Sequence, residues 1–227
     1  GWGAAHIRGG EGVEIRSLTN GQTILVLAGP RARDVLSTCA RGDWSRDAFP
    51  WLSVRECFIG FAPATVMGVS FSGELAYEIH VPNASLYAAY LALRKAGGAH
   101  GLKLFGARAV ESMRMEKGFL HWKADLITEF DPFETGLSRF VKMDKGGFIG
   151  KEALLGRQAE GPRKKLVTLQ IDATHAPAHG GASLMQDGKV VGTVTSGDWG
   201  HRVGMNLAYA FVDPALAAED SAMQIDM

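Results

Sequence analysis

Residues 69–80 read Val-Ser-Phe-Ser-Gly-Glu-Leu-Ala-Tyr-Glu-Ile-His, and this stretch decides the interpretation of the fold. Bulky residues alternate with small or polar ones on both sides of its centre. This pattern is typical of two half-buried β-strands joined by a turn, here at Ser72-Gly73-Glu74. Backbone on both sides of a turn can aim a carboxylate at a ligand, so Glu74 is a candidate binding residue. The alternative is a solvated surface turn, which is what most Gly-Glu pairs form.

A second informative stretch, residues 106–122, reads Gly-Ala-Arg-Ala-Val-Glu-Ser-Met-Arg-Met-Glu-Lys-Gly-Phe-Leu-His-Trp. It begins as an amphipathic helix. Arg108, Glu111 and Arg114 are spaced three apart and are therefore neighbours on one helix face. On spacing alone, these residues form either an exposed ladder of ion pairs or part of a ligand site.

The chain as a whole is predicted to be an α+β protein, with mixed strands and helices followed by strands only. Turn signals at Asn20-Gly21 and Asp187-Gly188 each predict a hairpin. The polar segment 156–162 is the best linker, which predicts domains at 1–155 and 163–227. The expected strands are 11–15, 23–28, 54–60, 65–71, 165–171, 182–186, 190–196 and 207–212; the expected helices begin at Gly29-Pro30 or cover 83–96, 106–115 (with Ala109, Val110 and Met113 inward) and part of 147–155.

Composition excludes several classes of protein. The formal net charge is +0, from 24 basic and 24 acidic residues, which gives no broad basic surface for nucleic acid. No apolar run is long enough to cross a membrane. Cys39 and Cys57 are the only cysteines and form no close pair, which favours a cytoplasmic or similar reducing compartment. No glycine-rich nucleotide loop is present, and Pro177 interrupts the His175–His179 spacing that a helical metal site would need.

Taken together, residues 69–80 and 106–122 resemble the aminomethyltransferase family, which comprises the T-protein of glycine cleavage and its relatives. The C-terminal folate-binding domain of dimethylglycine and sarcosine dehydrogenases is the most similar group. Three further segments follow the family's order along the chain: Leu25-Val-Leu-Ala-Gly-Pro-Arg-Ala-Arg-Asp-Val-Leu36, Phe148-Ile-Gly-Lys-Glu-Ala-Leu154 and Gly192-Thr-Val-Thr-Ser-Gly197.

The resemblance implies a folate-binding domain at 1–155 followed by a small, incomplete β-barrel at 163–227. It implies that Glu74 accepts N–H donors from the edge of a reduced pterin, next to Phe71, where the family usually has Tyr. Arg108, with Arg114 as a weaker second candidate, would bind the carboxylates of the folate tail. Trp122 would form an aromatic wall for the rings, or else be a core residue. Trp199, in a glycine-rich loop, would either face the cleft or be part of a simple turn.

The activity implied is tetrahydrofolate-dependent one-carbon transfer from a methylamine such as sarcosine or dimethylglycine, with FAD only on an upstream domain. The alternatives are a stand-alone aminomethyltransferase of glycine cleavage, a folate-dependent demethylase and a non-catalytic folate-binding module. The family's catalytic Asp would lie before residue 1, and the chain is expected to be truncated at both ends and inactive by itself. Asp34, Asp125 and Asp131 do not match its motif, so the catalytic residue is unknown.

Overall fold

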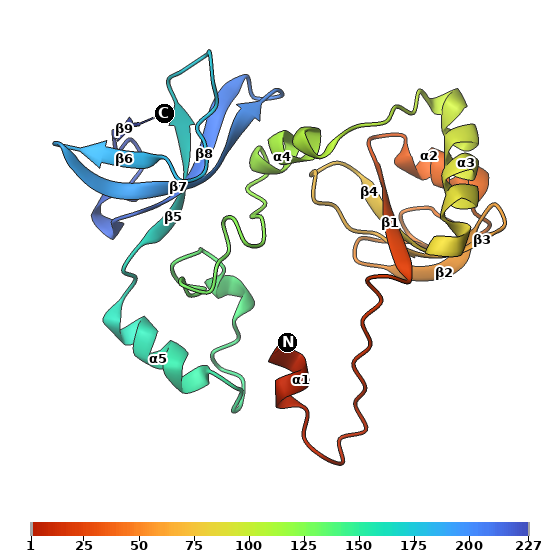
Figure 1. Cartoon of the computed structure of the whole chain (residues 1–227), viewed down its shortest axis with the longest axis horizontal. Helices are drawn as coiled ribbons and strands as arrows, with labels where there is room; N and C mark the ends of the chain where they lie inside the picture. Colours follow the sequence, from red (N-terminus) through yellow and green to blue (C-terminus); the bar gives the residue numbers. More distant parts are fainter. Residues whose placement is uncertain (1, 227) are drawn as a thin grey trace. The chain divides into compact units, whose positions relative to one another are not determined.

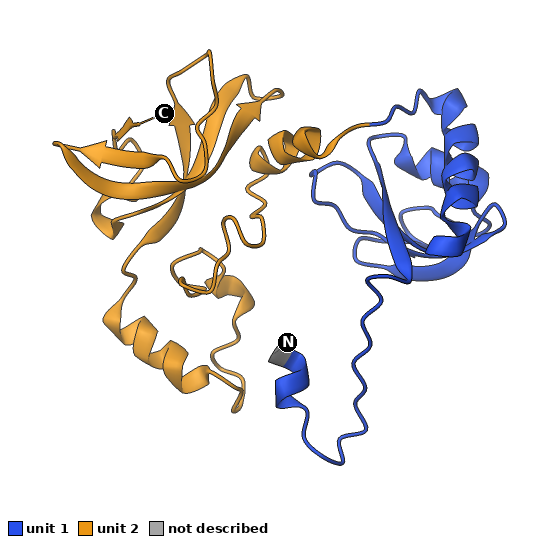
Figure 2. Cartoon of the chain, in the orientation of Figure 1, with its two compact units in different colours: residues 1–104 blue, residues 105–227 orange. Residues whose placement is uncertain are grey.

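A computed structural model describes residues 2–226, which form two compact units, with the division between Leu104 and Phe105 (Figure 2). We refer to them as unit 1 and unit 2. Apart from short 3₁₀ turns, the elements of unit 1 are α1 (Trp2–His6), β1 (Gln22–Ala28), α2 (Ala32–Cys39), β2 (Val54–Ile59), β3 (Ala62–Met67), β4 (Ala76–Pro82) and α3 (Leu86–Gly97). Those of unit 2 are α4 (Ala107–Met115), α5 (Lys151–Glu160), β5 (Lys165–Ile171), β6 (Ser183–Gln186), β7 (Lys189–Gly200), β8 (Met205–Val212) and β9 (Gln224–Ile225).

The sheet of unit 1 has the strand order β1-β4-β3-β2 and is antiparallel throughout (Figure 1). Pro63 lies within β3 although proline has no N–H to donate to a ladder. It is tolerated because β3 pairs with β4 only over Thr65–Met67, so the Pro63 end of the strand has a partner on one side alone.

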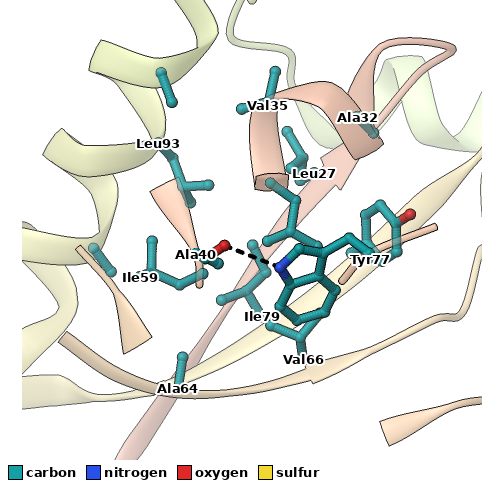
Figure 3. Close-up of a cluster of buried hydrophobic side chains, with 14 of the residues drawn as sticks. Leu27, Ala32, Val35, Ala40, Ile59, Ala64, Val66, Tyr77, Ile79 and Leu93 are labelled. Atoms are coloured by element: carbon teal, nitrogen blue, oxygen red, sulfur yellow. Dashed lines mark hydrogen bonds between the residues drawn. The ribbon is translucent and has the colours of Figure 1, made fainter. Parts of the chain in front are cut away.

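The core of unit 1 is apolar and lies between this sheet and the helices α2 and α3 (Figure 3). Strand residues such as Ile59 and Ile79 are fully buried against Leu36 of α2. Trp44 is also buried, and its Nε1 donates to the carbonyl oxygen of Ala40 at 3.0 Å, the bond drawn in Figure 3. The single polar atom of this large side chain therefore has a partner, as buried polar atoms require.

Two strand predictions in unit 1 were wrong. Residues 11–15 are exposed and form no strand, and β1 pairs with β4 instead, from Gln22↔Pro82 to Ala28↔Ala76. The predicted strand over 65–71 ends at Met67, so Glu74 lies in an eight-residue loop, Gly68–Leu75, and not in a tight turn. Alternation was a weak guide here because the exposed residues of 11–15 alternate without any core to face.

The sheet of unit 2 is antiparallel, with strand order β5-β8-β7-β6-β9. Within residues 2–226 no pairing joins the outer strands β5 and β9, so the sheet does not close into a barrel. The predicted Asp187-Gly188 hairpin is confirmed: both residues have positive φ (51° and 73°), as a two-residue turn between strands requires.

Three expectations for unit 2 are corrected. Helix α5 runs through Gly156 to Glu160, so most of the expected linker is helical. Trp199 lies within β7, opposite Asn206, and not in a loop. On α4 the buried residues are Ser112, Arg114 and Met115, whereas Ala109 is exposed and Val110 and Met113 are only half-buried; the face of α4 that contacts the protein is therefore largely polar.

The division into domains at 155 and 163 stays a prediction. In the part of the chain that the structure describes, no helix is both long and apolar enough to cross a membrane.

Candidate functional site

The loop between β3 and β4, Gly68–Leu75, positions Glu74. Ser72 is buried within it, and the Ser72 Oγ accepts the backbone N–H of Glu74 at 3.4 Å. Gly73 has φ +75°, a left-handed conformation that side chains rarely adopt. The loop ends where the N–H of Gly29 donates to the carbonyl oxygen of Leu75 at 2.9 Å. A bond to the Ser72 side chain on one side and a backbone bond at Leu75 on the other thus hold the half-buried Glu74.

Phe71 lies in the same loop and its side chain is 37% exposed. Glu74 and Phe71 therefore share one loop of unit 1.

Arg108 and Trp122 belong to unit 2. Arg108 lies in the first turn of α4 and is exposed. Trp122 is 66% exposed, so it is not the core residue that was the alternative interpretation. It stands in a loop, Phe119–Leu126, that follows α4; we call it the Trp122 loop.

A buried polar cluster, which we call the Arg114 cluster, joins α4 to the Trp122 loop and to β7. The side chains of Arg114 and Asp125 are 1% and 0% exposed, and Arg114 Nη1 donates to Asp125 Oδ2 at 2.7 Å. Arg114 Nη2 also donates to Ser196 Oγ at 2.8 Å, and its Nε donates to Glu111 Oε2 at 2.6 Å. A buried charge is tolerated when it is paired and hydrogen-bonded, as Arg114 is here.

Further contacts attach α4 to the strands of unit 2. Ser112 Oγ donates to the carbonyl oxygen of Trp199 at 2.6 Å, and Glu116 Oε1 accepts the N–H of Arg202 at 2.6 Å. The Tyr209 hydroxyl donates to the carbonyl oxygen of Met115 at 2.7 Å. Helix α4 is therefore docked on β7 and β8 through polar groups.

Gly197, the last residue of the segment 192–197, permits close packing. A Cβ there would lie 2.2 Å from the carbonyl oxygen of Ala178, a distance that no side chain could accommodate. Gly192 is similarly restricted, because its Cβ would lie 2.5 Å from the carbonyl oxygen of Phe211. This segment of the family pattern thus has a packing role at both ends.

Asp34, Asp125 and Asp131 each pair with an arginine. Asp125 is in the Arg114 cluster, Asp34 pairs with Arg31, and Asp131 accepts a bond from Arg157 Nε at 3.1 Å. The prediction that none of them is a catalytic base stays a prediction.

Both cysteines lie where burial disfavours the thiolate. Both are free thiols in the half-buried surroundings of the unit 1 core. Burial raises the pKa of the Cys39 thiol to about 11 and also raises the pKa of Cys57. Because only the thiolate attacks, a raised pKa disfavours a nucleophilic role for either thiol.

Residues 2–226 contain no group of three or more His, Cys, Asp or Glu side chains arranged to hold a metal ion. His175 and His179 are both exposed, in the irregular segment between β5 and β6.

Sequence reasoning missed the Arg114 cluster. Arg114 was treated as a surface residue or a second tail-binding arginine, and Asp125 and Ser196 were given no role. Arg-rich spacing on a helix usually indicates a solvated face, so only the small polar residues of Gly192-Thr-Val-Thr-Ser-Gly197, on a strand that faces α4, could have suggested a buried partner.

Residues 1–145 match the model of the GCVT N-terminal domain, and residues 164–227 match that of the glycine cleavage T-protein C-terminal barrel domain. The chain belongs to the glycine cleavage T-protein family. Its resemblance to that family, inferred from five short segments, is confirmed, and so is the α+β fold class.

The relatives include two kinds of protein. Mitochondrial dimethylglycine dehydrogenase of Homo sapiens is 33% identical to this chain; the match covers 97% of this chain and 26% of the dehydrogenase. Mitochondrial sarcosine dehydrogenase of Mus musculus is 36% identical; the match covers 85% of this chain and 21% of the dehydrogenase. An aminomethyltransferase of Caldanaerobacter subterraneus is 30% identical; the match covers 94% of this chain and 56% of the aminomethyltransferase.

A solved structure shares the fold. The glycine cleavage system aminomethyltransferase T from Bartonella henselae superimposes with a TM-score of 0.78 at 25% identity, over 91% of this chain and 55% of that chain. The chain thus spans about a quarter of the dehydrogenases and just over half of the aminomethyltransferases that it matches. It is an aminomethyltransferase-type chain related to both groups.

Proposed function

We propose that this chain binds reduced folate and takes part in one-carbon transfer from a methylamine donor to that folate. Membership of the T-protein family supports the reaction class. The observation that carries the proposal is the half-buried carboxylate of Glu74 on the ordered loop between β3 and β4.

A carboxylate suits one end of this ligand. A reduced pterin presents a row of N–H donors along one ring edge, and a carboxylate accepts through two parallel oxygens without donating. Phe71, exposed on the same loop, offers an aromatic face without the hydroxyl that Tyr would supply. When bound, the folate would supply the nitrogen that accepts the carbon; the chain's own residues would bind and orient it.

The other end of a folate carries carboxylates. Arg108 is exposed in the first turn of α4, and a planar guanidinium binds a carboxylate through two parallel bonds. Arg114 is withdrawn as a second tail-binding residue in this proposal, because its side chain is 1% exposed. Trp122, 66% exposed, is proposed as the aromatic surface for the rings.

The donor proposed is sarcosine or dimethylglycine, since the relatives named above include dehydrogenases of both amines. An aminomethyl donor, as the name aminomethyltransferase implies for another relative, is the second candidate. A cytoplasmic or other reducing compartment is part of the proposal, with which the two free thiols agree.

Calorimetric titration with tetrahydrofolate tests the role of Glu74. Glu74→Gln leaves the size of the side chain unchanged but replaces one acceptor oxygen by a donor. Binding should weaken by roughly 2 kcal/mol or more, about 30-fold, because N–H donors of the ligand lose their acceptor. Glu56→Gln, an exposed carboxylate on β2 of the same unit, is the control and should bind as the wild type does. Equal affinity of Glu74→Gln and wild type would remove Glu74 from the site.

Arg108 has its own test. Arg108→Lys keeps the charge but loses the planar fork, so tetrahydrofolate should bind more weakly while a pterin without the glutamate tail binds both proteins equally. If the variant loses the tail-less pterin to the same extent, Arg108 has no part in tail binding.

A further inference from the structure

The Trp122 loop is a compact turn. The backbone N–H groups of Asp125 and Leu126 both donate to the carbonyl oxygen of His121, at 2.9 and 3.1 Å. The N–H of Lys123 donates to the carbonyl oxygen of Leu126 at 2.9 Å, and Lys123 has φ +71°. Trp122 therefore stands at the exposed end of a turn whose own backbone bonds close it.

One buried ion pair holds both ends of this loop. Arg114 Nη1 donates to the carbonyl oxygen of Phe119 at 3.0 Å and to Asp125 Oδ2 at 2.7 Å. The same Asp125 oxygen accepts the N–H of His121 at 2.7 Å. The residue just before Trp122 and the start of the loop are thus both bonded to the Arg114–Asp125 pair.

Two hydroxyls of β7 extend these contacts to the sheet. Ser196 Oγ and Thr195 Oγ1 donate to Asp125 Oδ1, at 2.6 and 2.5 Å. Both carboxylate oxygens of Asp125 are therefore fully used, one toward the loop and one toward the strand.

We propose that Arg114 and Asp125 are positioning residues for Trp122: they fix the loop so that the indole is presented at the surface as a platform for the rings of the ligand. The inference rests on the proposed function. A buried ion pair is seldom the most stable way to fill a core, since apolar residues of similar volume often do as well. The pair here instead supplies directional bonds to Phe119 and His121, which an apolar replacement would leave without a partner. Its effect is to specify one loop geometry.

A double-mutant cycle in tetrahydrofolate affinity tests the proposal. Trp122→Leu should weaken binding about 5- to 100-fold, the range typical of an aromatic ring stacked on a base. Asp125→Asn should weaken it by a similar or smaller factor, because its amide cannot accept from both Arg114 and the β7 hydroxyls. In the double variant the loss should equal that of Trp122→Leu alone, because Asp125 acts through Trp122. If the losses of affinity of the two single variants instead multiply in the double variant, the proposal is overturned.

Glu134→Gln is the matched control. Glu134 is another fully buried carboxylate of unit 2, paired with Arg163 at 2.9 Å and making none of the contacts given above for the Trp122 loop. It should lower stability without changing affinity. Equal loss of affinity in Asp125→Asn and Glu134→Gln would show that Asp125 affects binding only through stability, against the proposal.

A readout without folate keeps the inference separate from the proposed function. In protein labelled with 5-fluorotryptophan, the ¹⁹F resonance of Trp122 is the one that Trp122→Leu removes. Asp125→Asn should shift or broaden that resonance, and Glu134→Gln should leave it in place. Ser196→Ala, which removes one hydroxyl bond to Asp125, should give a smaller shift and serves if Asp125→Asn does not fold.

An unchanged resonance in these variants overturns the positioning role. If the wild type binds no tetrahydrofolate, the platform role falls with the proposed function, and the ¹⁹F result alone decides whether the ion pair fixes the loop.

Discussion

Each of the two units is stabilised internally by a different kind of contact. In unit 1 the buried side chains between sheet and helices are almost all apolar, with Leu36, Ile59 and Ile79 at 0% exposure. In unit 2 the contact between α4 and the sheet is made by Arg114, Asp125 and the hydroxyls around them. Unit 2 does have a small apolar cluster, which includes Leu184 of β6 and Val194 of β7.

The difference separates two physical tasks. Apolar burial is non-directional and stabilises a unit in proportion to the area removed from water. A buried ion pair contributes less net stability. Removing one partner nevertheless destabilises the protein strongly, because the other charge is left buried and uncompensated. Unit 1 should therefore lose stability in proportion to the buried apolar volume that a mutation removes, whereas unit 2 should be sensitive to a change in a single charge.

The largest effect is expected at Asp125. Asp125→Ala leaves the buried guanidinium of Arg114 without its main counter-charge and should destabilise unit 2 by about 3–5 kcal/mol. Denaturant unfolding, with amide exchange to distinguish the units, would measure it. Replacing both members, Arg114→Met with Asp125→Leu, should recover much of the loss. A double variant as unstable as the single one would mean that the hydrogen bonds, and not the charges, dominate.

The corresponding change in unit 1 is Ile79→Ala. This side chain is fully buried at the centre of the sheet, and its truncation should cost about 2–4 kcal/mol, through lost transfer free energy and the cavity that remains. The control is Ile24→Ala on the neighbouring strand β1, where the side chain is 48% exposed and the cost should be well under 1 kcal/mol. The comparison of units fails if Ile79→Ala is as mild as Ile24→Ala.

The same contrast explains what could be predicted from the sequence. Strand β5 was predicted over its full length, Lys165–Ile171, because a strand with one buried face shows its period in the sequence. The helices α3 and α4 and the Asp187-Gly188 turn were also predicted correctly, to within a few residues. These features depend on local period or on turn chemistry.

Contacts between distant segments could not be predicted in that way. Asp125 and Ser196 are 71 residues apart, and nothing in either segment indicates that the other lies beside it. The strand predicted at 11–15 failed for the same reason, because the partner of β1 turned out to be β4, whose paired residues lie far along the chain, from Gln22↔Pro82 to Ala28↔Ala76. Glu74, Phe71, Arg108 and Trp122 were singled out by their resemblance to the family, and their roles stay predictions.

A pH experiment tests whether the charges of unit 2 matter outside the Arg114 cluster. Hydrogen bonds from Arg163 lower the pKa of the Glu134 carboxyl to about 2 in the folded protein, below its ordinary value of 4.5. Because the folded pKa is depressed, this group stabilises the fold above about pH 4.5, and that contribution is lost as the pH falls toward 2. Since Arg163 is half exposed and screened by solvent, the expected loss is on the order of 2 kcal/mol.

Glu134→Gln should remove this part of the pH dependence, which unfolding free energies measured between pH 5 and pH 2 would show. A variant with the same acid sensitivity as the wild type would assign the effect to other carboxylates.

The smallest expected effect compares two tyrosines, each 1% exposed, one in each unit. Tyr209 of β8 donates to the carbonyl oxygen of Met115 at 2.7 Å, and desolvation raises its pKa to about 12, so the hydroxyl keeps its proton through the neutral range. Tyr209→Phe keeps the ring but leaves a buried carbonyl at the end of α4 with one bond fewer, which should cost about 1–2 kcal/mol.

The hydroxyl of Tyr77 in unit 1 instead accepts from Arg33 Nε at 3.1 Å, and Arg33 is only partly buried. Tyr77→Phe should therefore cost a few tenths of a kcal/mol, because water can replace the lost acceptor. Unfolding midpoints of the two variants under the same conditions make the measurement. If Tyr77→Phe proves the more costly, hydrogen bonding is at least as important to the apolar unit as to the polar one, and the contrast between the two units is wrong at the level of single bonds.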